Sequence, residues 1–327
     1  MTTIDHAPTT DDFAMNDRAW RIADEMCERS AELRIHSTRL ENGTRLIDAG
    51  VDTRGGFAAG LALARICMGG LGHVSYQPVV IGDDALPGVQ VWTDHPAISC
   101  MAAQYAGWAV KVAGFFGMGS GPLRAQARVE HELFAKLGYA ESARRGVLVL
   151  ETRHMPTEQV AAWIAQRSEL DPSQLTLIVA PTASIAGCVQ IVARSLETGL
   201  HKMDSLGFDV TRVVSGAGTA PVPPVPADDG VAIGRTNDCI LYAAQARYVV
   251  DATDEELALL ADQLPAVASR DYGTPFHEIF ARYNNDFYKI DPLLFSPAEV
   301  WLTSSGSGRT FHAGQLNPDV LNRSLFS

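Results

Sequence analysis

APTASIAGCVQIVARSLETGLHK, residues 180–202, predicts a short turn that leads into a long amphipathic helix ending near Gly207. An apolar run at residues 175–180 comes directly before it and predicts a buried strand. At 100° per residue, the apolar side chains of the helix fall in one sector; they are Ile185, Val189, Val192, Leu196, Leu200 and Met203. We therefore expect this face of the helix to pack into a core.

A different sector of the same helix carries polar side chains. Gln190, Arg194, Glu197 and His201 are separated by offsets of four, three and four residues, which places them on one narrow stripe. A carboxylate and a guanidinium held three residues apart on a rigid helix can activate a water molecule and stabilise developing charge. The alternative is a solvated helix face with an ordinary surface ion pair.

Helical and strand-like patterns alternate along the rest of the chain. Asn42-Gly43 predicts a type I′ hairpin turn, and a glycine-rich loop is expected at residues 114–122 and a proline-rich one at residues 216–226. Helices are expected at residues 17–34, 54–68, 122–137, 156–167 and 255–263 and after Thr274-Pro275, and strands at residues 73–80, 89–93, 147–151, 239–250, 299–304 and 309–312. Because several strand pairs are joined by tight turns, we predict an α+β fold and not a purely parallel sheet.

Length and composition narrow the class of protein. The chain has 327 residues and is 46% hydrophobic, which favours two domains, and we divide them at residues 1–150 and 151–327. The net charge of −12 argues against a nucleic-acid partner. No apolar stretch is long enough to span a bilayer, and the polar N-terminus is not a secretory signal. We expect a cytoplasmic protein without a membrane partner.

Cysteine and histidine usage gives no indication of a metal site. The five cysteines are widely spaced and lie among apolar residues, which is typical of reduced, buried thiols; they are Cys27, Cys67, Cys100, Cys188 and Cys239. The nine histidines are scattered singly, and the chain has no CxxC motif. We therefore predict that no metal is bound.

Two short segments combine turn residues with a predicted helix start. Gly119, Ser120 and Gly121 lead into a helix N-terminus, where backbone N–H groups favour an anion or a polar ligand edge; the alternative is a tight turn in which Ser120 caps the helix. Thr182 and Ser184 follow a buried strand, so they could bind a heterocycle or could simply cap the next helix.

Two further segments carry polar groups suited to a ligand. Asn237 and Asp238, expected just before a strand, can read the donor and acceptor edge of a pterin or purine, or can form an Asx turn. Lys289 lies among aromatic residues in the segment 285–299, which also has a purely structural interpretation as a turn with a snorkelling lysine. No Ser-His-Asp, Cys-His or kinase-type set can be assigned.

Taken together, these segments resemble those of the methenyltetrahydromethanopterin cyclohydrolase family. The resemblance covers nearly the whole chain, from about Arg18 to Phe326, and the ordered set is far more specific than any one motif. The matching stretches are QYAGW at 104–108, GSGP-x-RA at 119–125, APT-x-S-x-AG at 180–187, VAR-xx-E-xxx-HK at 192–202, GFD at 207–209, GRTND at 234–238 and FYKID-xx-LFSPAE at 287–299.

The resemblance implies hydrolysis of the 5,10-methenyl group of a methanopterin-type one-carbon carrier to the 5-formyl form. It implies a subunit of two mixed α/β domains with the pterin in a cleft between them, usually a homotrimer, and no metal or organic cofactor. The family's catalytic Arg-Glu pair maps onto Arg194 and Glu197. Substrate-binding residues are then expected at Gly119, Ser120, Gly121, Thr182, Ser184, Gln190, His201, Lys202, Asn237, Asp238 and Lys289.

Two segments depart from the family pattern. Ala243-Ala244-Gln245 stands where a glycine-rich patch is expected, and the proline loop at residues 222–226 is individual. They leave room for a shifted pterin preference. The alternatives to the cyclohydrolase activity are a non-catalytic pterin-binding paralogue and a phosphate- or nucleotide-binding α/β enzyme that uses the glycine-rich loop.

Overall fold

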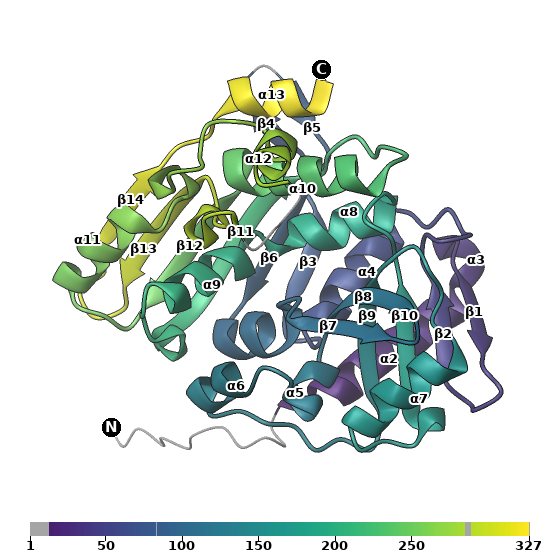
Figure 1. Ribbon diagram of the computed structural model, residues 1–327. Helices are drawn as coiled ribbons and strands as arrows, with labels where there is room; N and C mark the ends of the chain where they lie inside the picture. Colours follow the sequence, from purple (N-terminus) through teal and green to yellow (C-terminus); the bar gives the residue numbers. More distant parts are fainter. Residues whose placement is uncertain (1–12, 83, 285–288, 327) are drawn as a thin grey trace, which may run out of the picture.

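The computed structural model describes residues 13–82, 84–284 and 289–326, and within them the strands form two six-stranded sheets and one small hairpin. The sheets lie on opposite sides of the molecule in Figure 1, and helices α4 (Phe57–Cys67), α8 (Ile185–Val192) and α10 (Asp229–Ala243) lie between them. A Cβ on Gly60 of α4 would lie 2.5 Å from Cβ of Val189, so glycine lets α4 and α8 approach closely. The mixed α/β class predicted from the sequence is confirmed.

The first sheet, sheet A, has a parallel centre and antiparallel edges. Its strand order is β1 (His36–Arg39), β2 (Arg45–Asp48), β10 (Leu175–Val179), β9 (Gly146–Glu151), β8 (Phe115–Ser120) and β7 (Trp108–Val112). β10 pairs in parallel with both β2 and β9, and all five of its residues are buried. Such an apolar run is typical of a strand covered on both faces.

Helices cover both faces of sheet A. α2 (Met15–Glu28), with the short α3 (Ser30–Leu33) behind it, packs with α4 on one face, and α7 (Glu158–Arg167) packs on the other. Adjacent β10 residues enter different cores: Ile178 joins the cluster with α2 and α4, whereas Leu177 joins the cluster with α7.

The second sheet, sheet B, is antiparallel except at one pair. Its order is β14 (Thr310–Gly314), β13 (Glu299–Ser304), β12 (Gln245–Val250), β11 (Val213–Pro221), β6 (Gly88–Thr93) and β3 (His73–Tyr76), and β12 and β13 are parallel. The hairpin of β4 (Val79–Ile81) and β5 (Asp84–Leu86) lies apart from both sheets. The largest core cluster joins the inner face of sheet B to α8 and α10.

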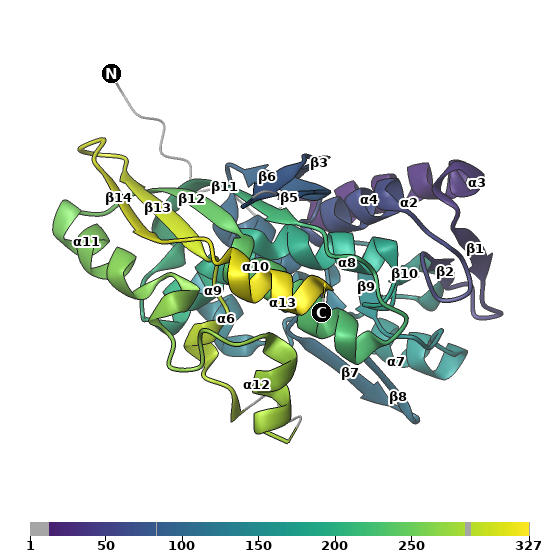
Figure 2. The ribbon, with the colours of Figure 1, turned by 90° about the horizontal axis from the view of Figure 1, so that it is seen from above.

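The remaining helices lie around sheet B and α10. α11 (Asp254–Gln263) lies beside β13 and β14, and α12 (Phe276–Arg282) and α13 (Pro318–Phe326) pack against α10, as Figure 2 shows from above. None of the described helices is both long enough and apolar enough to cross a bilayer.

Strands from both sides of residue 150 contribute to both sheets. Sheet A takes β10 from the second half of the chain, and sheet B takes β3 and β6 from the first half. The pairing of β9 with β10 crosses the boundary that we expected between domains. The sequence segments therefore interleave between the two sheets, and the domain division at residue 150 stays a prediction.

Many of the predicted elements are confirmed with small shifts. The capping box of Thr253 and Glu256 is present at the start of α11, and the C-terminal hairpin is β13 and β14. The expected helix at residues 17–34 is divided between α2 and α3 at Arg29, and the strand expected at residues 73–80 is divided between β3 and β4.

The turn at Asn42-Gly43 is not the expected type I′ turn. Five residues separate the paired residues Arg39 and Arg45, and only Gly43 has a positive φ, of 88°. The Asn42 side chain instead accepts a hydrogen bond from the Thr44 N–H at 3.1 Å. The longer loop therefore removes the need for a positive φ at asparagine.

The glycine-rich loop expected at residues 114–122 is mostly a strand. Ser120 ends β8 and does not cap a helix, so the predicted cap is wrong. The two-residue turn before β8 is Ala113-Gly114, in which both φ angles are positive, at 51° and 79°. The helix expected at 122–137 is two short helices, α5 (Leu123–Ala127) and α6 (His131–Leu137), because Arg128 adopts a left-handed φ of 48°.

Two predictions in the second half are also wrong in part. Residues 216–221, expected within a loop, belong to β11, where small residues pair with β6 and β12. The GRTND segment at 234–238, expected before a strand, lies inside α10, which Asp228 caps by accepting a hydrogen bond from the Val231 N–H. The strand expected at 239–250 is therefore confined to Gln245–Val250.

Candidate functional site

The predicted long helix is interrupted within the polar stripe. α8 is followed by a short 3-10 helix, η3 (Ala193–Ser195), and then by α9 (Glu197–Ser205). Gln190 of α8 and Arg194 of η3 stay in contact, because Gln190 Oε1 accepts a hydrogen bond from the Arg194 guanidinium at 3.1 Å. Arg194 therefore belongs to the 3-10 turn, whereas Glu197 begins the next helix.

Sheet B fixes the position of this interruption. A Cβ on Gly218 of β11 would lie 2.6 Å from the Ser195 hydroxyl, so the strand and the turn are in close contact. The Tyr248 hydroxyl of β12 donates a hydrogen bond to the Leu196 carbonyl at 2.9 Å. The same carbonyl also accepts the long helical hydrogen bond from the Leu200 N–H at 3.4 Å, so the Tyr248 bond attaches the start of α9 to β12.

Arg194 is buried and held by three hydrogen bonds. Its side chain donates to the Gln104 carbonyl at 2.5 Å, to the Ser120 hydroxyl at 3.2 Å and to Gln190 Oε1 at 3.1 Å. Arg194 is 8% exposed and Glu197 is 4% exposed. The alternative of a solvated helix face with a surface ion pair is therefore wrong for these two residues.

Glu197 is a buried carboxyl surrounded by cationic groups. Burial raises its pKa above the usual value, and the charges of Arg194, His201 and Arg124 act in the opposite direction. Among the ion pairs between described residues, none joins Arg194 to Glu197 directly. Arg194 therefore acts on the Glu197 carboxyl through space and not through a direct ion pair.

A π-helix, η1 (Ala97–Gln104), borders this site, and no sequence pattern predicted it. Gln104 is fully buried; its amide donates to the Ala193 carbonyl at 3.1 Å, while its backbone carbonyl accepts from Arg194. Tyr105 follows, and its ring stacks on His201 with a centroid distance of 4.8 Å. Both residues belong to the QYAGW motif at 104–108, but nothing in the sequence indicated what either one does.

Several predicted binding residues lie beside Arg194 or Glu197. Ser120 and Gln190 contact Arg194, and His201 acts electrostatically on Glu197. Gly121 is near but uses its N–H on the Ala103 carbonyl at 2.8 Å, so that N–H is not available to an anion. Gly119 lies inside β8, paired with Trp108.

Thr182 and Ser184 have internal hydrogen-bond partners. The Thr182 hydroxyl donates to Glu151 at 2.5 Å, and Ser184 caps α8 by accepting from the Gly187 N–H at 3.0 Å. The cap function that we considered for Ser184 is thus confirmed.

The structure gives Asn237, Asp238 and Lys202 internal partners too. Asn237 donates to the Ile233 carbonyl within α10, and Asp238 accepts from the Phe276 N–H and the Ser324 hydroxyl, so the alternative of an Asx turn at these residues is wrong. Lys202 is fully buried and donates to the Pro265 carbonyl at 2.8 Å. Burial lowers its pKa to about 8. Lys289 is exposed.

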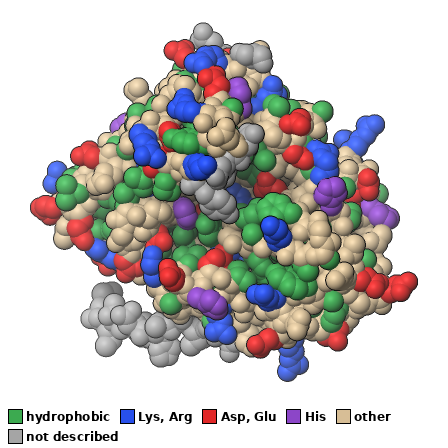
Figure 3. Space-filling model, viewed as in Figure 1, with side chains coloured by type: hydrophobic (Ala, Val, Ile, Leu, Met, Phe, Trp, Pro, Cys, Tyr) green, Lys and Arg blue, Asp and Glu red, His purple; other side chains and the backbone are tan. Residues whose placement is uncertain are grey.

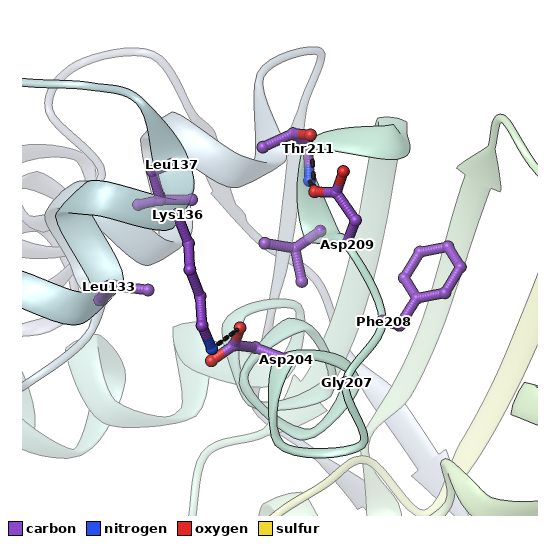
Figure 4. Close-up of a pocket in the computed structure, with 9 residues that line it drawn as sticks. Leu133, Lys136, Leu137, Asp204, Gly207, Phe208, Asp209 and Thr211 are labelled. Atoms are coloured by element: carbon purple, nitrogen blue, oxygen red, sulfur yellow. Dashed lines mark hydrogen bonds and ion pairs between the residues drawn. The ribbon is translucent and has the colours of Figure 1, made fainter.

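The cavities elsewhere on the described surface include two that have charged side chains in their lining. One, of about 310 Å³, opens between α6 and the end of α9, where the Lys136 ammonium reaches the Asp204 carboxylate across 2.8 Å (Figure 4). The other, of about 660 Å³, lies between α10, α12 and α13 and is lined by Arg235, His277 and Arg323 among others. Neither is lined by Arg194 or Glu197.

The outer surface carries a hydrophobic area but no cluster of metal ligands among the described residues. Figure 3 shows that hydrophobic side chains occupy a broad area near the centre of the viewed face, with charges of both signs around it. The described residues contain no group of three or more His, Cys, Asp and Glu side chains arranged to hold a metal ion. The five cysteines are free thiols.

Comparisons with known proteins agree along almost the whole chain. A family model described as "Cyclohydrolase (MCH)" matches residues 14–325. A protein of Methanococcoides burtonii named methenyltetrahydromethanopterin cyclohydrolase is 42% identical over 314 residues, which is 96% of this chain and 98% of that protein. Proteins with the same name are 45% identical in Methylobacillus flagellatus (92% of this chain, 91% of the relative) and 46% identical in Methylobacterium organophilum (90% and 91%).

Proposed function

This chain belongs to the methenyltetrahydromethanopterin cyclohydrolase family, and we propose that it hydrolyses a 5,10-methenyl-tetrahydromethanopterin, or a related pterin one-carbon carrier, to the 5-formyl form. The observation that carries the proposal is the buried pair of Arg194 and Glu197 at the break between α8 and α9. The relatives of this chain come from both methanogens and methylotrophs, which suits an enzyme of one-carbon metabolism.

The proposed reaction needs water, a base and a proton donor. The methenyl carbon lies between two nitrogens that share a positive charge, so it is already electrophilic. Water adds to that carbon as its proton passes to the Glu197 carboxylate. Glu197 then returns the proton to N10 as the carbon–N10 bond breaks, and loss of the hydroxyl proton leaves the 5-formyl group. The sum consumes one water and releases one proton.

The surroundings of Glu197 support this role. Burial raises the pKa of its carboxyl, while the charges of Arg194, His201 and Arg124 act against that rise. A carboxyl whose pKa is raised above its usual value is a better proton acceptor than an ordinary one, which suits a group that takes a proton from water and returns it. Charge stabilisation from Arg194 does not require contact with the carboxylate. The hydrogen bonds from Arg194 to Gln104, Ser120 and Gln190 hold its guanidinium in one orientation.

We assign substrate binding to the predicted residues nearest this pair. Ser120, Gln190 and His201 contact or act on Arg194 and Glu197. For Thr182, Asn237, Asp238 and Lys202 the internal partners favour a supporting structural role. We further propose that the enzyme needs no metal or organic cofactor, acts in the cytoplasm, as its free thiols favour, and assembles as a homotrimer.

The test is to add methenyl-tetrahydromethanopterin to the purified protein and to follow the loss of its near-UV absorbance. Turnover that is first order in enzyme supports the proposal. Tight binding without turnover would instead indicate a non-catalytic pterin-binding paralogue. Thermal stabilisation by nucleotides, with none by the pterin, would indicate a phosphate-binding enzyme.

A further inference from the structure

A second buried arginine, Arg124, acts on the Glu197 carboxyl. Arg124, in α5, is fully buried and donates to the carbonyls of Met101 and Ala103 at 3.1 and 3.2 Å. Its Nε and Nη2 atoms both donate to Glu130 Oε1, at 2.9 and 2.6 Å. The Glu130 side chain is 19% exposed, so the pair lies almost wholly inside the protein.

The two arginines hold the same end of the π-helix. Arg124 binds the carbonyls of Met101 and Ala103, and Arg194 binds the carbonyl of Gln104, which is the last residue of η1. Cations are favourable at a helix C-terminus, where backbone carbonyls lack partners within the helix. The position of the Arg194 guanidinium therefore depends on a helix end that Arg124 fixes.

A second route joins Arg124 to Glu197. The Arg124 guanidinium lies over the Tyr105 ring, 5.1 Å from its centroid, and the same ring stacks on His201. His201 lies one helical turn after Glu197 on α9. Arg124 thus acts on the Glu197 carboxyl through its charge, and the stacked rings of Tyr105 and His201 form a packed connection toward α9.

A glycine next to the Arg124–Glu130 ion pair provides the space that the Glu130 carboxylate occupies. A Cβ on Gly107 would lie 1.6 Å from Glu130 Oε1, so any other residue there would displace the carboxylate. Gln104, Tyr105 and Gly107 of the QYAGW motif contact Arg194, His201 and Glu130 respectively. The motif thus surrounds the Arg124–Glu130 pair.

We propose that Arg124 is a positioning residue for the hydrolysis: paired with Glu130, it fixes the end of the π-helix that orients Arg194 and sets the charge around Glu197. This inference rests on the proposed function of Arg194 and Glu197. A buried ion pair is weak support for stability, because desolvation offsets much of its attraction. The pair is therefore better explained by position and charge than by stabilisation alone.

The titratable groups that act on Glu197 come from every element packed around it. Arg194 belongs to η3, His201 to α9 and Arg124 to α5, while Cys100 of η1 and Tyr248 of β12 each have a pKa raised in part by the Glu197 charge. Within the described part of the chain, Arg124 is the one of these groups that forms an ion pair with a carboxylate, Glu130. Changing that partner alters the charge near Glu197 without touching Arg194.

The experiment compares Arg124→Met with Glu130→Gln in pH profiles of kcat. Removing the Arg124 charge raises the pKa of Glu197, so the acid limb of the profile moves to higher pH. Removing the Glu130 charge leaves Arg124 uncompensated and lowers the pKa of Glu197, so the acid limb moves to lower pH. Arg124→Lys keeps the charge but loses the planar guanidinium that binds two carbonyls and Glu130 at once. Its kcat is therefore expected to fall roughly 10- to 100-fold at similar KM.

Lys136→Met is the matched control, since it removes a cation from the exposed pair with Asp204 on the outer side of α6 (Figure 4). Its profile should match that of the unchanged enzyme. Glu130→Gln keeps size and an acceptor for Arg124, so it remains informative if Arg124→Met does not fold.

Opposite movements of the acid limb cannot arise from a merely loosened structure, and they support the inference. Acid limbs that stay in place in folded Arg124→Met and Glu130→Gln, or both moving the same way, would overturn it. Glu197→Gln is measured alongside: if it retains turnover, the proposed function fails. If Glu197→Gln is inactive while the Arg124 and Glu130 variants behave as the control, only the positioning role fails.

Discussion

Arg194 Nη1 and the carbonyl oxygen of Gln104 are 2.5 Å apart, although the two residues are separated by 90 positions in the sequence. This bond ties the break between α8 and α9 to the end of the π-helix. A catalytic group on a surface helix would need no such anchor. The bond therefore marks Arg194 as a residue whose orientation is fixed from outside its own helix.

Glu197→Gln is expected to fold normally and to lose turnover by roughly 10²- to 10⁴-fold, because glutamine cannot accept the proton from water. The measurement is kcat by loss of methenyl-pterin absorbance, with circular dichroism to verify folding. Asp204→Asn on the same helix is the control and should keep its activity, since its ion pair with Lys136 is exposed. Turnover close to that of the unchanged enzyme would remove Glu197 from the mechanism.

Arg194→Lys is expected to lower kcat sharply, because an ammonium cannot bind Gln104, Ser120 and Gln190 in the geometry of the guanidinium. Loss of buried hydrogen bonds should also lower the free energy of unfolding, by about 1–3 kcal/mol. Arg153→Lys, at the exposed pair with Asp229, is the control and should change stability by less than ~1 kcal/mol. Unchanged kcat at saturating substrate would contradict the role of Arg194.

Prolonged chelation is expected to leave kcat unchanged, because the proposed chemistry uses an already electrophilic carbon. The assay compares enzyme dialysed against a strong chelator with enzyme dialysed against buffer alone. Activity that disappears on chelation and returns with an added divalent ion would show that a metal takes part.

Glu141 is expected to make stability fall as the pH rises. Burial raises its pKa from 4.5 to about 7, although its carboxyl accepts a hydrogen bond from the Asn16 N–H at 2.9 Å. Folding therefore binds a proton, and this contribution to stability is complete below about pH 4.5 and lost as the pH rises through about 7. Burial raises the pKa of Asp238 to about 7 as well, so it adds a change of the same sign.

Urea denaturation at about pH 5.5 and about pH 8 measures this effect. Glu141→Gln should lose part of the pH dependence and should gain stability relative to the unchanged protein at the higher pH. An identical pH dependence in both proteins would mean that the Glu141 carboxyl does not titrate in this range.

Gly199→Ala is expected to destabilise the protein by about 1–3 kcal/mol. The new Cβ would lie 2.0 Å from the Tyr248 hydroxyl, which must move and release the Leu196 carbonyl. Because Leu196 lies between Arg194 and Glu197, kcat should fall too. Gly56→Ala is the control, since no atom lies within 4 Å of its added Cβ. Equal stability of the two variants would mean that α9 and β12 are not in tight contact.

Local signals account for the elements that the sequence predicted well. The helices expected to end at residue 137 and to begin at residue 255 are bounded by such signals: Gly138 adopts a left-handed φ after α6, and Thr253 and Glu256 form a capping box at the start of α11. The π-helix has no such local signature. Likewise, the strand β8 carries glycines that favour a loop by propensity, and only its pairing with β7 and β9 makes it a strand.

The candidate site was predictable in part for the same reason. The spacing of Gln190, Arg194 and Glu197 is local, and it indicated the stripe. That the stripe is buried depends on η1 and sheet B, which are distant in sequence. Arg124 could not be assigned a role, because its partners only meet it after folding.

The interleaved strands determine the order in which a newly synthesised chain can be completed. Sheet A has all its strands once residue 179 has left the ribosome, but β6 must wait for β11, which begins at Val213. Until then β6, whose Val89 and Val91 are fully buried in the finished fold, has no β11 beside it to pair with. A nascent chain in that state exposes an unpaired apolar edge of the kind that chaperones bind. Expression yield should therefore depend on the temperature and pace of translation more than on the stability of the completed enzyme.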